Sequence, residues 1–271
     1  MRIAVAQMTS GIDPAKNAEQ LDASIAEAAE GGAVMLFTPE MTGLLDRDRQ
    51  RASRSISTED EDISLATARR AARQHNIWIA LGSLAIDRGN GRWANRSFVI
   101  NHRGEVVARY DKLHMFDVDL ASGESWQESK AYEAGDDVVT AQTPCGRLGL
   151  TICYDVRFPA LFNTLGRHQC DVISIPAAFT KPTGEAHWHV LVRARAIEAS
   201  AFVVAAAQVG GHDDGRVTYG HSLVVDPWGE VLLDMGGTEP GLGFVDLDMT
   251  AIERARAQVP SLANRRVMPN C

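Results

Sequence analysis

Residues Thr151–Pro159 read TICYDVRFP, which places a cysteine at the point where an apolar run stops and a polar turn begins. Gly149–Ile152 predicts a short buried strand, and the polar stretch from Asp155 leads into an apolar-periodic helix. A strand-to-helix turn exposes a side chain beside free backbone N–H groups, which suits a thiolate and the oxyanion that its attack creates. Cys153 is therefore a candidate nucleophile, with a buried small residue as the simpler interpretation.

The other three cysteines fit structural roles better. Cys145 lies between a proline and a glycine, Cys170 precedes an apolar strand and Cys271 is the last residue. No pair has C-x-x-C spacing, so neither a zinc site nor a dithiol motif is indicated. We therefore expect reduced cysteines and a cytoplasmic location.

The composition predicts a soluble globular protein that binds neither membranes nor nucleic acids. The 271 residues are 45% hydrophobic, which allows a sizeable core. No secretory signal pattern follows Met1, and the longest apolar stretch, Ala201–Ala207, is far shorter than the roughly 20 residues that span a bilayer. A net charge of -8 and the lack of a dense Lys/Arg stripe argue against a nucleic-acid surface.

An internal repeat organises the chain. Four segments recur in the same order, and each pair predicts a strand or a hairpin. The pairs are Ile3–Gln7 with Leu148–Ile152, Ala33–Pro39 with Asp171–Pro176, Ile77–Leu81 with Phe202–Ala206, and Ser97–Val107 with Ser222–Leu232. Shared strand composition would explain any one match, but the ordered set of four indicates an internal duplication.

Amphipathic helices are predicted between these strands, at Pro14–Glu30, Ile63–Gln74, Phe158–Leu165 and His187–Ala199. Because strands as apolar as Val34–Phe37 should be covered on both faces, we expect an α/β fold in which two mixed sheets pack together with helices outside, a four-layer α-β-β-α sandwich. No Pro/Gly/Ser linker divides the chain, which predicts a single domain over residues 1–271 with pseudo-repeats at about 1–140 and 145–250. The polar stretch 259–271 predicts a tail, or an arm that reaches a partner subunit.

Two more polar residues fall where sites gather in α/β folds. Glu40 follows the predicted strand Ala33–Phe37, and Lys112 follows the first-half hairpin. A carboxylate that moves protons, a thiol that attacks and a lysine that balances an oxyanion suffice for amide hydrolysis. Taken singly, Glu40 is also consistent with a surface or capping acid, and Lys112 with a solvated base.

Three segments together resemble the signatures of the nitrilase, or carbon-nitrogen hydrolase, superfamily, and the resemblance covers nearly the whole chain. They are Pro39-Glu40, Lys112-Leu113-His114 and Cys153 to Pro159, in the family's order. The family's fold is the same two-sheet sandwich. The resemblance implies that Cys153 is the nucleophile, Glu40 the general base and then acid, and Lys112 the electrostatic clamp on the tetrahedral intermediate.

The resemblance also assigns roles around this triad. Glu128 matches the family's second glutamate, which orients the lysine and the substrate amide, and the backbone N–H of Tyr154 would complete the oxyanion hole. It implies a cysteine thioester intermediate that needs no metal or organic cofactor. Family members are typically homo-oligomers, so a homodimer or a higher homo-oligomer is expected.

Within the superfamily the chain resembles the Nit branch of amidases, which implies a small acidic amide as substrate. Residues 205–212 and 219–222 look most like the deaminated glutathione amidases, whereas residues 116–135 resemble ω-amidases acting on α-ketoglutaramate equally well. Aliphatic amides, nitriles and N-carbamoyl amines stay open, because enzymes for them share the triad. A catalytically inert binding or scaffold protein of this fold is the alternative outside enzymes.

A substrate carboxylate would have to be held by local groups, since a net charge of -8 gives no long-range attraction for an anion. Arg157 is a candidate, although a structural pairing with Asp155 is equally consistent. The segment Phe179–Gly184 should face the same cleft and adds Lys181 and loop N–H groups. The predicted substrate-binding residues are Tyr154, Arg157, Phe179 and Thr180.

Histidines offer two further interpretations. His187-Trp188-His189 does not predict a metal site, because residues two apart on a helix point apart. A papain-like pair of Cys153 with His114 is the rival catalytic interpretation, but the sequence around the cysteine lacks the papain signature.

Overall fold

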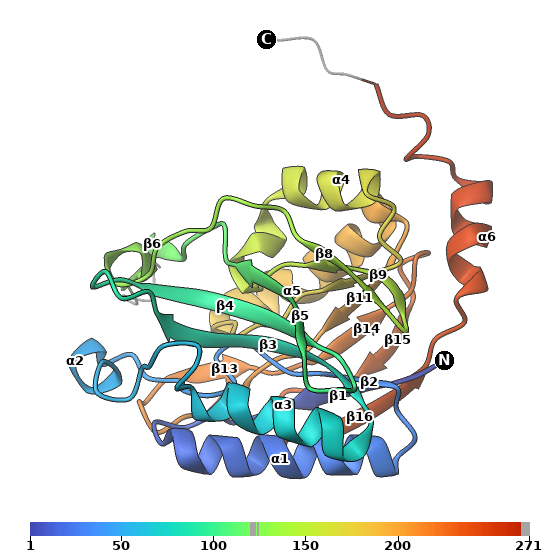
Figure 1. Cartoon of the computed structure of the whole chain (residues 1–271). Helices are drawn as coiled ribbons and strands as arrows, with labels where there is room; N and C mark the ends of the chain where they lie inside the picture. The colour runs from blue at the N-terminus through green and yellow to red at the C-terminus, as the bar shows by residue number, and fades with distance from the viewer. Residues whose placement is uncertain (120–122, 124, 267–271) are drawn as a thin grey trace.

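The computed structural model describes residues 1–119, 123 and 125–266, which form two β-sheets packed face to face with helices outside (Figure 1). Cys271 and the last part of the predicted tail 259–271 lie outside the described residues. Within the described part of that tail, Arg265 donates to the carbonyls of Asn163 at 2.7 Å and Glu198 at 2.8 Å, so this stretch packs against its own chain.

The first sheet has the strand order β16-β1-β2-β3-β4-β5. Its strands are β16 (Gly241–Asp246), β1 (Arg2–Gln7), β2 (Met35–Phe37), β3 (Trp78–Asp87), β4 (Trp93–Ile100) and β5 (Val106–Asp111). The three strands β1, β2 and β3 are parallel, and the others pair antiparallel.

The second sheet has the order β15-β14-β11-β10-β9-β8, with β9, β10 and β11 parallel. Its strands are β15 (Val231–Asp234), β14 (Leu223–Val225), β11 (Phe202–Ala205), β10 (Val172–Ser174), β9 (Gly146–Leu150) and β8 (Thr140–Thr143). Two small hairpins complete the strands: β6 (Asp117–Asp119) with β7 (Ser125–Gln127), and β12 (Val209–Gly211) with β13 (Val217–Tyr219).

The two sheets repeat one topology, as the sequence repeat predicts. Strands β1, β2, β3 and the β4–β5 hairpin take the places of β9, β10, β11 and the β14–β15 hairpin. Strand β16 pairs antiparallel with β1 as β8 pairs with β9, although β16 comes from the far end of the chain. The first sheet is therefore completed by a strand from the second half, which ties the halves together.

Helices α1 (Pro14–Glu30) and α3 (Ile63–His75) cover the first sheet, and α4 (Pro159–Arg167) and α5 (Lys181–Ala199) cover the second. The short helices α2 (Arg49–Ala52) and α6 (Thr250–Gln258) lie at opposite edges in Figure 1. Helix α1 has the predicted bounds, because the Asp13 side chain accepts two N–H groups of its first turn. The predicted start of α5 at His187 was wrong: Pro182 lies in its first turn, where the fixed φ of proline favours a helix start.

Alternation along β1 shows why the layers form. Ile3 and Val5 pack into the core between the two sheets, whereas Ala4 and Ala6 pack against α1 and α3. Side chains of a strand point alternately to opposite faces, and here both faces are buried. This confirms the predicted four-layer α-β-β-α sandwich.

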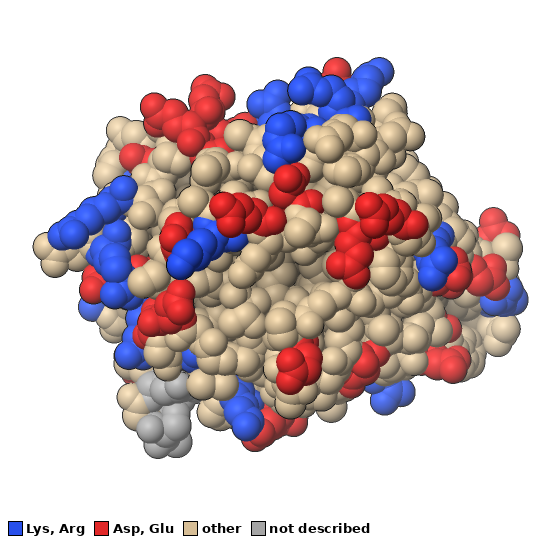
Figure 2. Space-filling view, turned by 90° about the horizontal axis from the view of Figure 1, so that it is seen from below, with Lys and Arg blue, Asp and Glu red and all other residues tan. Residues whose placement is uncertain are grey.

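The surface view (Figure 2) shows how the charged side chains are distributed. Figure 2 shows that, on the face viewed there, Lys and Arg side chains lie among Asp and Glu side chains rather than in one basic stripe. Among the described helices, none combines the length and the apolar character needed to cross a membrane.

Glycine at position 82 is required by a close approach of backbone. A Cβ added to Gly82 of β3 would lie 2.1 Å from the Thr38 carbonyl oxygen and 2.2 Å from that of Pro39. These contacts are with backbone, which cannot rotate away as a side chain would. Gly82 therefore lets β3 pass directly beneath the turn that carries Glu40.

We expect Gly82→Ala to lower the free energy of unfolding by about 1 to 3 kcal/mol, the usual cost of overpacking. Urea denaturation measures the change. Gly211→Ala is the matched control, because an added Cβ there meets nothing within 4 Å. Equal stability of the two variants would show that the Thr38–Pro39 turn yields easily.

Candidate active site

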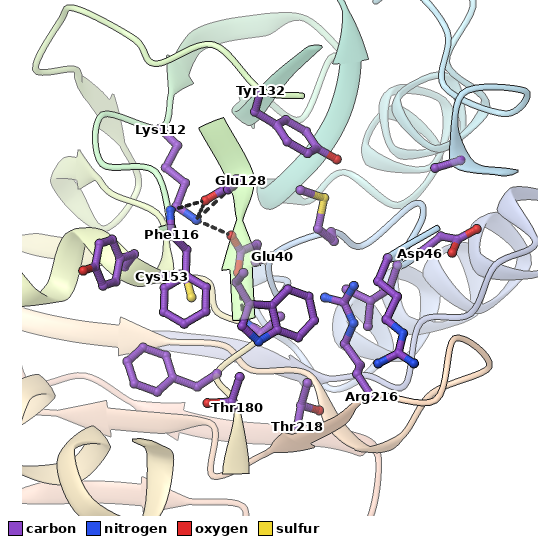
Figure 3. Close-up of a pocket in the computed structure, with 18 of the residues that line it drawn as sticks. Glu40, Asp46, Lys112, Phe116, Glu128, Tyr132, Cys153, Thr180, Arg216 and Thr218 are labelled. Atoms are coloured by element: carbon purple, nitrogen blue, oxygen red, sulfur yellow. Dashed lines mark hydrogen bonds and ion pairs between the residues drawn. The ribbon is translucent and has the colours of Figure 1, made fainter. Parts of the chain in front are cut away.

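One pocket brings together the four residues predicted to act in catalysis, Glu40, Lys112, Glu128 and Cys153 (Figure 3). They come from four separate segments: the turn after β2, the residue after β5, the start of the 3-10 helix Glu128–Lys130, and the start of the 3-10 helix Cys153–Arg157. The turns after β2 and β9 lie at the carboxyl ends of parallel strands, where α/β folds place their sites.

Lys112 lies buried between two carboxylates. Its Nζ donates to Glu40 Oε1 at 2.9 Å and to Glu128 at 3.1 Å (Oε1) and 2.8 Å (Oε2). The Lys112 side chain is 2% exposed, so these contacts replace water around a full charge. Glu128 is fixed in turn by the Phe116 N–H, which donates to Oε2 at 2.7 Å.

Asn95 is a site residue that the sequence did not reveal. Its Nδ2 donates to Glu40 Oε1 at 2.9 Å and to Glu128 Oε1 at 3.0 Å, so one amide bridges the two carboxylates. Asn95 belongs to β4 and is fully buried. A polar side chain at a buried strand position was the available signal, but pairing it with two glutamates distant in sequence required the fold.

The Glu40 turn is held from several sides. Gln208 Nε2 donates to the Glu40 carbonyl at 3.0 Å, and the Ala178 N–H donates to Glu40 Oε2 at 3.0 Å. The next residue, Met41, has a φ of 56°, a conformation that non-glycine residues adopt at a cost. The carboxylate therefore has one defined orientation toward Cys153.

The ionisation of the site is set by burial and by these contacts. Burial raises the pKa of Glu40, but the charge of Lys112 and hydrogen bonds from Lys112, Cys153 and Asn95 outweigh it, and the pKa lies below its ordinary value. Burial lowers the pKa of Lys112, but Glu128 and Glu40 raise it well above its ordinary value. Burial and Glu40 raise the pKa of Cys153 well above its ordinary value. At neutral pH the site therefore holds a carboxylate, an ammonium and a neutral thiol.

Cys153 sits in a strained turn that a buried aspartate supports. Strand β9 ends at Leu150 rather than at the predicted Ile152, and Cys153 has a φ of 47°. Asp155, fully buried, accepts the Ile152 N–H at 2.8 Å, the Tyr110 hydroxyl at 2.7 Å and the His114 ring at 2.7 Å. The His114 ring therefore contacts Asp155 and stacks on Phe158. The rival interpretation of a papain-like pair between His114 and Cys153 was wrong.

The predicted substrate-binding residues do not all line the pocket. Tyr154, Phe179 and Thr180 line the pocket, but Arg157 does not. The Arg157 guanidinium lies 5.9 Å from the centre of the Tyr154 ring and 5.2 Å from that of the Phe179 ring, and its Nη1 lies 3.3 Å from His187 Nδ1. The suggested pairing of Arg157 with Asp155 was also wrong, because Asp155 is occupied by groups that converge on its buried position.

The pocket contains cations that the sequence did not point to. Lys181, which the sequence suggested as a carboxylate ligand, does not line the pocket. Its Nζ lies 4.0 Å from Glu185 Oε1 on the first turns of α5. The described residues that line it and carry a positive charge are Arg47, Arg49, Lys112 and Arg216. No local motif marks these three arginines, since their common position arises only from folding.

A histidine group lies outside the pocket. His187 and His189 diverge on α5, as expected for residues two apart, and His189 joins His221 and Asp234, with ligand-type atoms within 4.8 Å of one another. Asp234 accepts hydrogen bonds at 3.0 Å from His189 and 2.8 Å from His221. These hydrogen bonds explain why the three side chains lie so close together. That the protein needs no metal stays a prediction.

Comparison with known proteins places this geometry in context. The sequence pattern of the carbon-nitrogen hydrolase family matches residues 2–257. The deaminated glutathione amidase of Dictyostelium discoideum is 36% identical over 273 residues, covering 98% of this chain and 94% of that protein.

Solved structures show the same likeness. The Caenorhabditis elegans NitFhit protein superimposes with a TM-score of 0.89 at 38% identity, over 98% of this chain and 65% of that one, so the chain spans about two thirds of the fusion protein. The amidase of Nesterenkonia sp. AN1 is 28% identical with a TM-score of 0.80, over 96% of this chain and 98% of that one. Its structure shows Michael addition of acrylamide at the active site cysteine of that enzyme.

We expect the rate of Cys153 alkylation by iodoacetamide to stay nearly constant between about pH 5 and 7. A free thiol loses reactivity about tenfold per pH unit there, because only its thiolate reacts. We expect Glu40 to accept the thiol proton during attack, and its lowered pKa keeps it ionised until the pH falls through that pKa. Mass spectrometry of the labelled protein measures the rate.

Glu40→Gln keeps the shape of this side chain but removes the base, so its alkylation rate should rise about tenfold per pH unit across the same range. The other two described cysteines, Cys145 and Cys170, serve as internal references, since burial raises the pKa of each to about 12. A wild-type rate that rises as steeply as that of Glu40→Gln would exclude Glu40 as the base.

Proposed function

Because the chain belongs to the carbon-nitrogen hydrolase family, we propose that it hydrolyses the amide bond of a small acidic α-keto amide, with deaminated glutathione as its substrate. The carrying observation is that one pocket holds the neutral Cys153 thiol and the Glu40 carboxylate, and that Glu40 accepts a hydrogen bond from the buried ammonium of Lys112 at 2.9 Å. A nucleophile, its base and a cation for the oxyanion are thereby assembled before substrate binds.

In the proposed first step, the Cys153 sulfur attacks the amide carbon while its proton passes to Glu40. Negative charge leaves Glu40 and appears on the carbonyl oxygen, which Lys112 and the Tyr154 N–H stabilise. Because the charge moves between two places near the same ammonium, the total charge of the buried site does not change. This limits the electrostatic cost of the reaction at side chains that are themselves buried.

In the following steps, the C–N bond breaks and Glu40 returns its proton to the departing amine, leaving a thioester on Cys153. Water then loses a proton to Glu40 and attacks the thioester carbon. The C–S bond breaks, the sulfur regains a proton from Glu40, and the carboxylic acid is released. Glu128 keeps Lys112 in place throughout, through its two contacts and its own bond from the Phe116 N–H.

Deaminated glutathione fits this proposal because its scissile amide joins an α-keto acid to a peptide that ends in a second carboxylate. The named activity of the Dictyostelium relative, which aligns over nearly all of this chain, supports the same substrate. The arginines in the pocket suit anionic ends, whereas a neutral aliphatic amide would leave them unused.

We expect the purified protein to release α-ketoglutarate from deaminated glutathione, with a higher kcat/KM than on α-ketoglutaramate, glutamine or propionamide. Cys153→Ala should abolish turnover, because Cys153 is the only thiol among the described residues that line the pocket. Cys145→Ala is the matched control, since Cys145 is buried away from the pocket and should keep most activity. Turnover by Cys153→Ala at the wild-type rate would contradict the mechanism, and preference for propionamide would contradict the substrate.

We also propose a homodimer or a larger homo-oligomer that forms through the α5 face, defined here as Val190, Ile197 and Trp228. These side chains are 69%, 50% and 57% exposed. Val190 and Ile197 are seven residues apart on α5 and share one side of the helix. Arg193 of α5 donates to the Gly229 carbonyl at 2.8 Å, so the turn that carries Trp228 adjoins the helix.

Multi-angle light scattering should give a molar mass of at least twice that of the chain for the wild type. The double variant with Val190→Asp and Ile197→Asp should give the mass of one chain, because two buried charges would oppose association. Val107→Asp, at an exposed apolar position of β5, is the control that should leave the mass unchanged. A monomeric wild type at micromolar concentration would contradict this proposal.

We propose that the enzyme needs no cofactor and works in the cytoplasm. The mechanism above moves every proton and electron pair with side chains and water alone. A thiol nucleophile must stay reduced, which favours a reducing compartment.

A further inference from the structure

The pocket differs in charge from the molecule as a whole. The chain carries a net charge of -8, yet the charged residues that line the pocket are four cations and three carboxylates. Two of these carboxylates, Glu40 and Glu128, contact Lys112, and the third, Asp46, pairs with Arg51 at 2.7 Å. Among the residues that the structure describes, none of these three acids forms an ion pair with Arg47, Arg49 or Arg216.

Among these arginines, Arg216 is the one held in a fixed position by a buried acid. Its Nε donates to Asp214 Oδ2 at 2.8 Å, and its backbone N–H donates to Asp214 Oδ1 at 3.0 Å. The Asp214 side chain is fully buried and also accepts the Arg47 N–H at 2.8 Å. Burial raises the pKa of Asp214, but Arg216 outweighs this and lowers it, so the ion pair persists at neutral pH.

This arrangement leaves the outer edge of the guanidinium for a ligand. Within the described part of the chain, Arg216 donates to the side chain of Asp214 through Nε, so this pair does not use the end of the guanidinium formed by its two terminal nitrogens. In Figure 3 the guanidinium extends into the pocket from the side of Thr218 toward Glu40. The side chain is 17% exposed, so a carboxylate bound there would be largely shielded from water and from salt.

An aromatic residue of the pocket packs on the Arg216 guanidinium. The Arg216 guanidinium lies 4.8 Å from the centre of the Trp126 ring, and both residues line the pocket. The Trp126 Nε1 is buried and has no hydrogen-bond partner among the described residues. A buried indole N–H normally finds an acceptor, so Trp126 is a second residue of this pocket with an unused donor.

We propose that Arg216, held by Asp214, binds a carboxylate of the substrate and makes this enzyme selective for acidic amides over neutral ones. The proposal rests on the proposed function for its substrate, and it replaces Arg157 and Lys181 in the role that the sequence suggested for them. Asp214 acts as a positioning residue: it fixes the plane of the guanidinium so that the two terminal nitrogens meet a carboxylate in parallel.

The first test compares two substrates in one variant. Arg216→Gln should lower kcat/KM for deaminated glutathione about 10- to 100-fold, mainly through KM, because a charge-assisted contact to the substrate is lost. Its kcat/KM for propionamide, which has no carboxylate, should change less than about threefold. Arg216→Lys keeps the charge without the forked geometry and should fall between wild type and Arg216→Gln on the acidic amide.

Two further variants separate substrate binding from structure. Asp214→Asn should lower kcat/KM for deaminated glutathione more than for propionamide, since Arg216 keeps its charge but loses its fixed position. Arg103→Gln is the matched control, because Arg103 also pairs with an acid two residues away in a hairpin but lies outside the pocket. Equal losses on both substrates in Arg216→Gln would show a structural role and overturn the inference.

A binding measurement distinguishes failure of this inference from failure of the proposed function. Calorimetry should show deaminated glutathione binding to Cys153→Ala, which cannot turn it over, and binding about 10- to 100-fold weaker when Arg216→Gln is added. Arg216-dependent binding without wild-type turnover would reject deaminated glutathione as substrate but keep the carboxylate site. Turnover or binding that does not depend on Arg216, or no binding at all, would overturn the carboxylate site.

Discussion

The buried ammonium of Lys112 is the constraint on which the site depends. A full positive charge removed from water is tolerated only when opposite charges and hydrogen bonds replace that water. Glu40 and Glu128 supply both, and Asn95 links their two carboxylates. The result is a rigid group with a net negative charge, in which Glu40 stays ionised and the thiol of Cys153 stays protonated until a substrate arrives.

The fold supplies this group from segments far apart in the chain. Each sheet ends its parallel strands in a turn, and the face-to-face packing of the sheets brings the turns after β2 and β9 together. Both turns contain a non-glycine residue with positive φ, Met41 at 56° and Cys153 at 47°. Such backbone is held in place by its surroundings, here by Gln208 behind Glu40 and by Asp155 behind Cys153.

Under the proposed function, substrate selection depends on a charge at contact distance and not on the net charge of the whole protein. The net charge of -8 acts over the whole surface and is screened by salt within about 10 Å. A partly buried guanidinium such as that of Arg216 acts over contact distance and is screened less. An acidic protein can therefore bind an acidic substrate, provided that the cation is presented at the right place and held there by an acid such as Asp214.

The sequence by itself determined the elements and the chemistry of single residues. Capping by Asp13 bounded α1, continuous apolar runs implied buried strands, and the predicted strand-to-helix turn marked Cys153 as a candidate nucleophile. These signals are local, because they arise from neighbours within one or two helical turns. Only the tertiary structure decided that Asn95 bridges the glutamates and that Arg216, not Arg157, faces the pocket. The long side chain of an arginine can reach in several directions, and which of them leads to a site depends on segments that meet only after the sheets have packed.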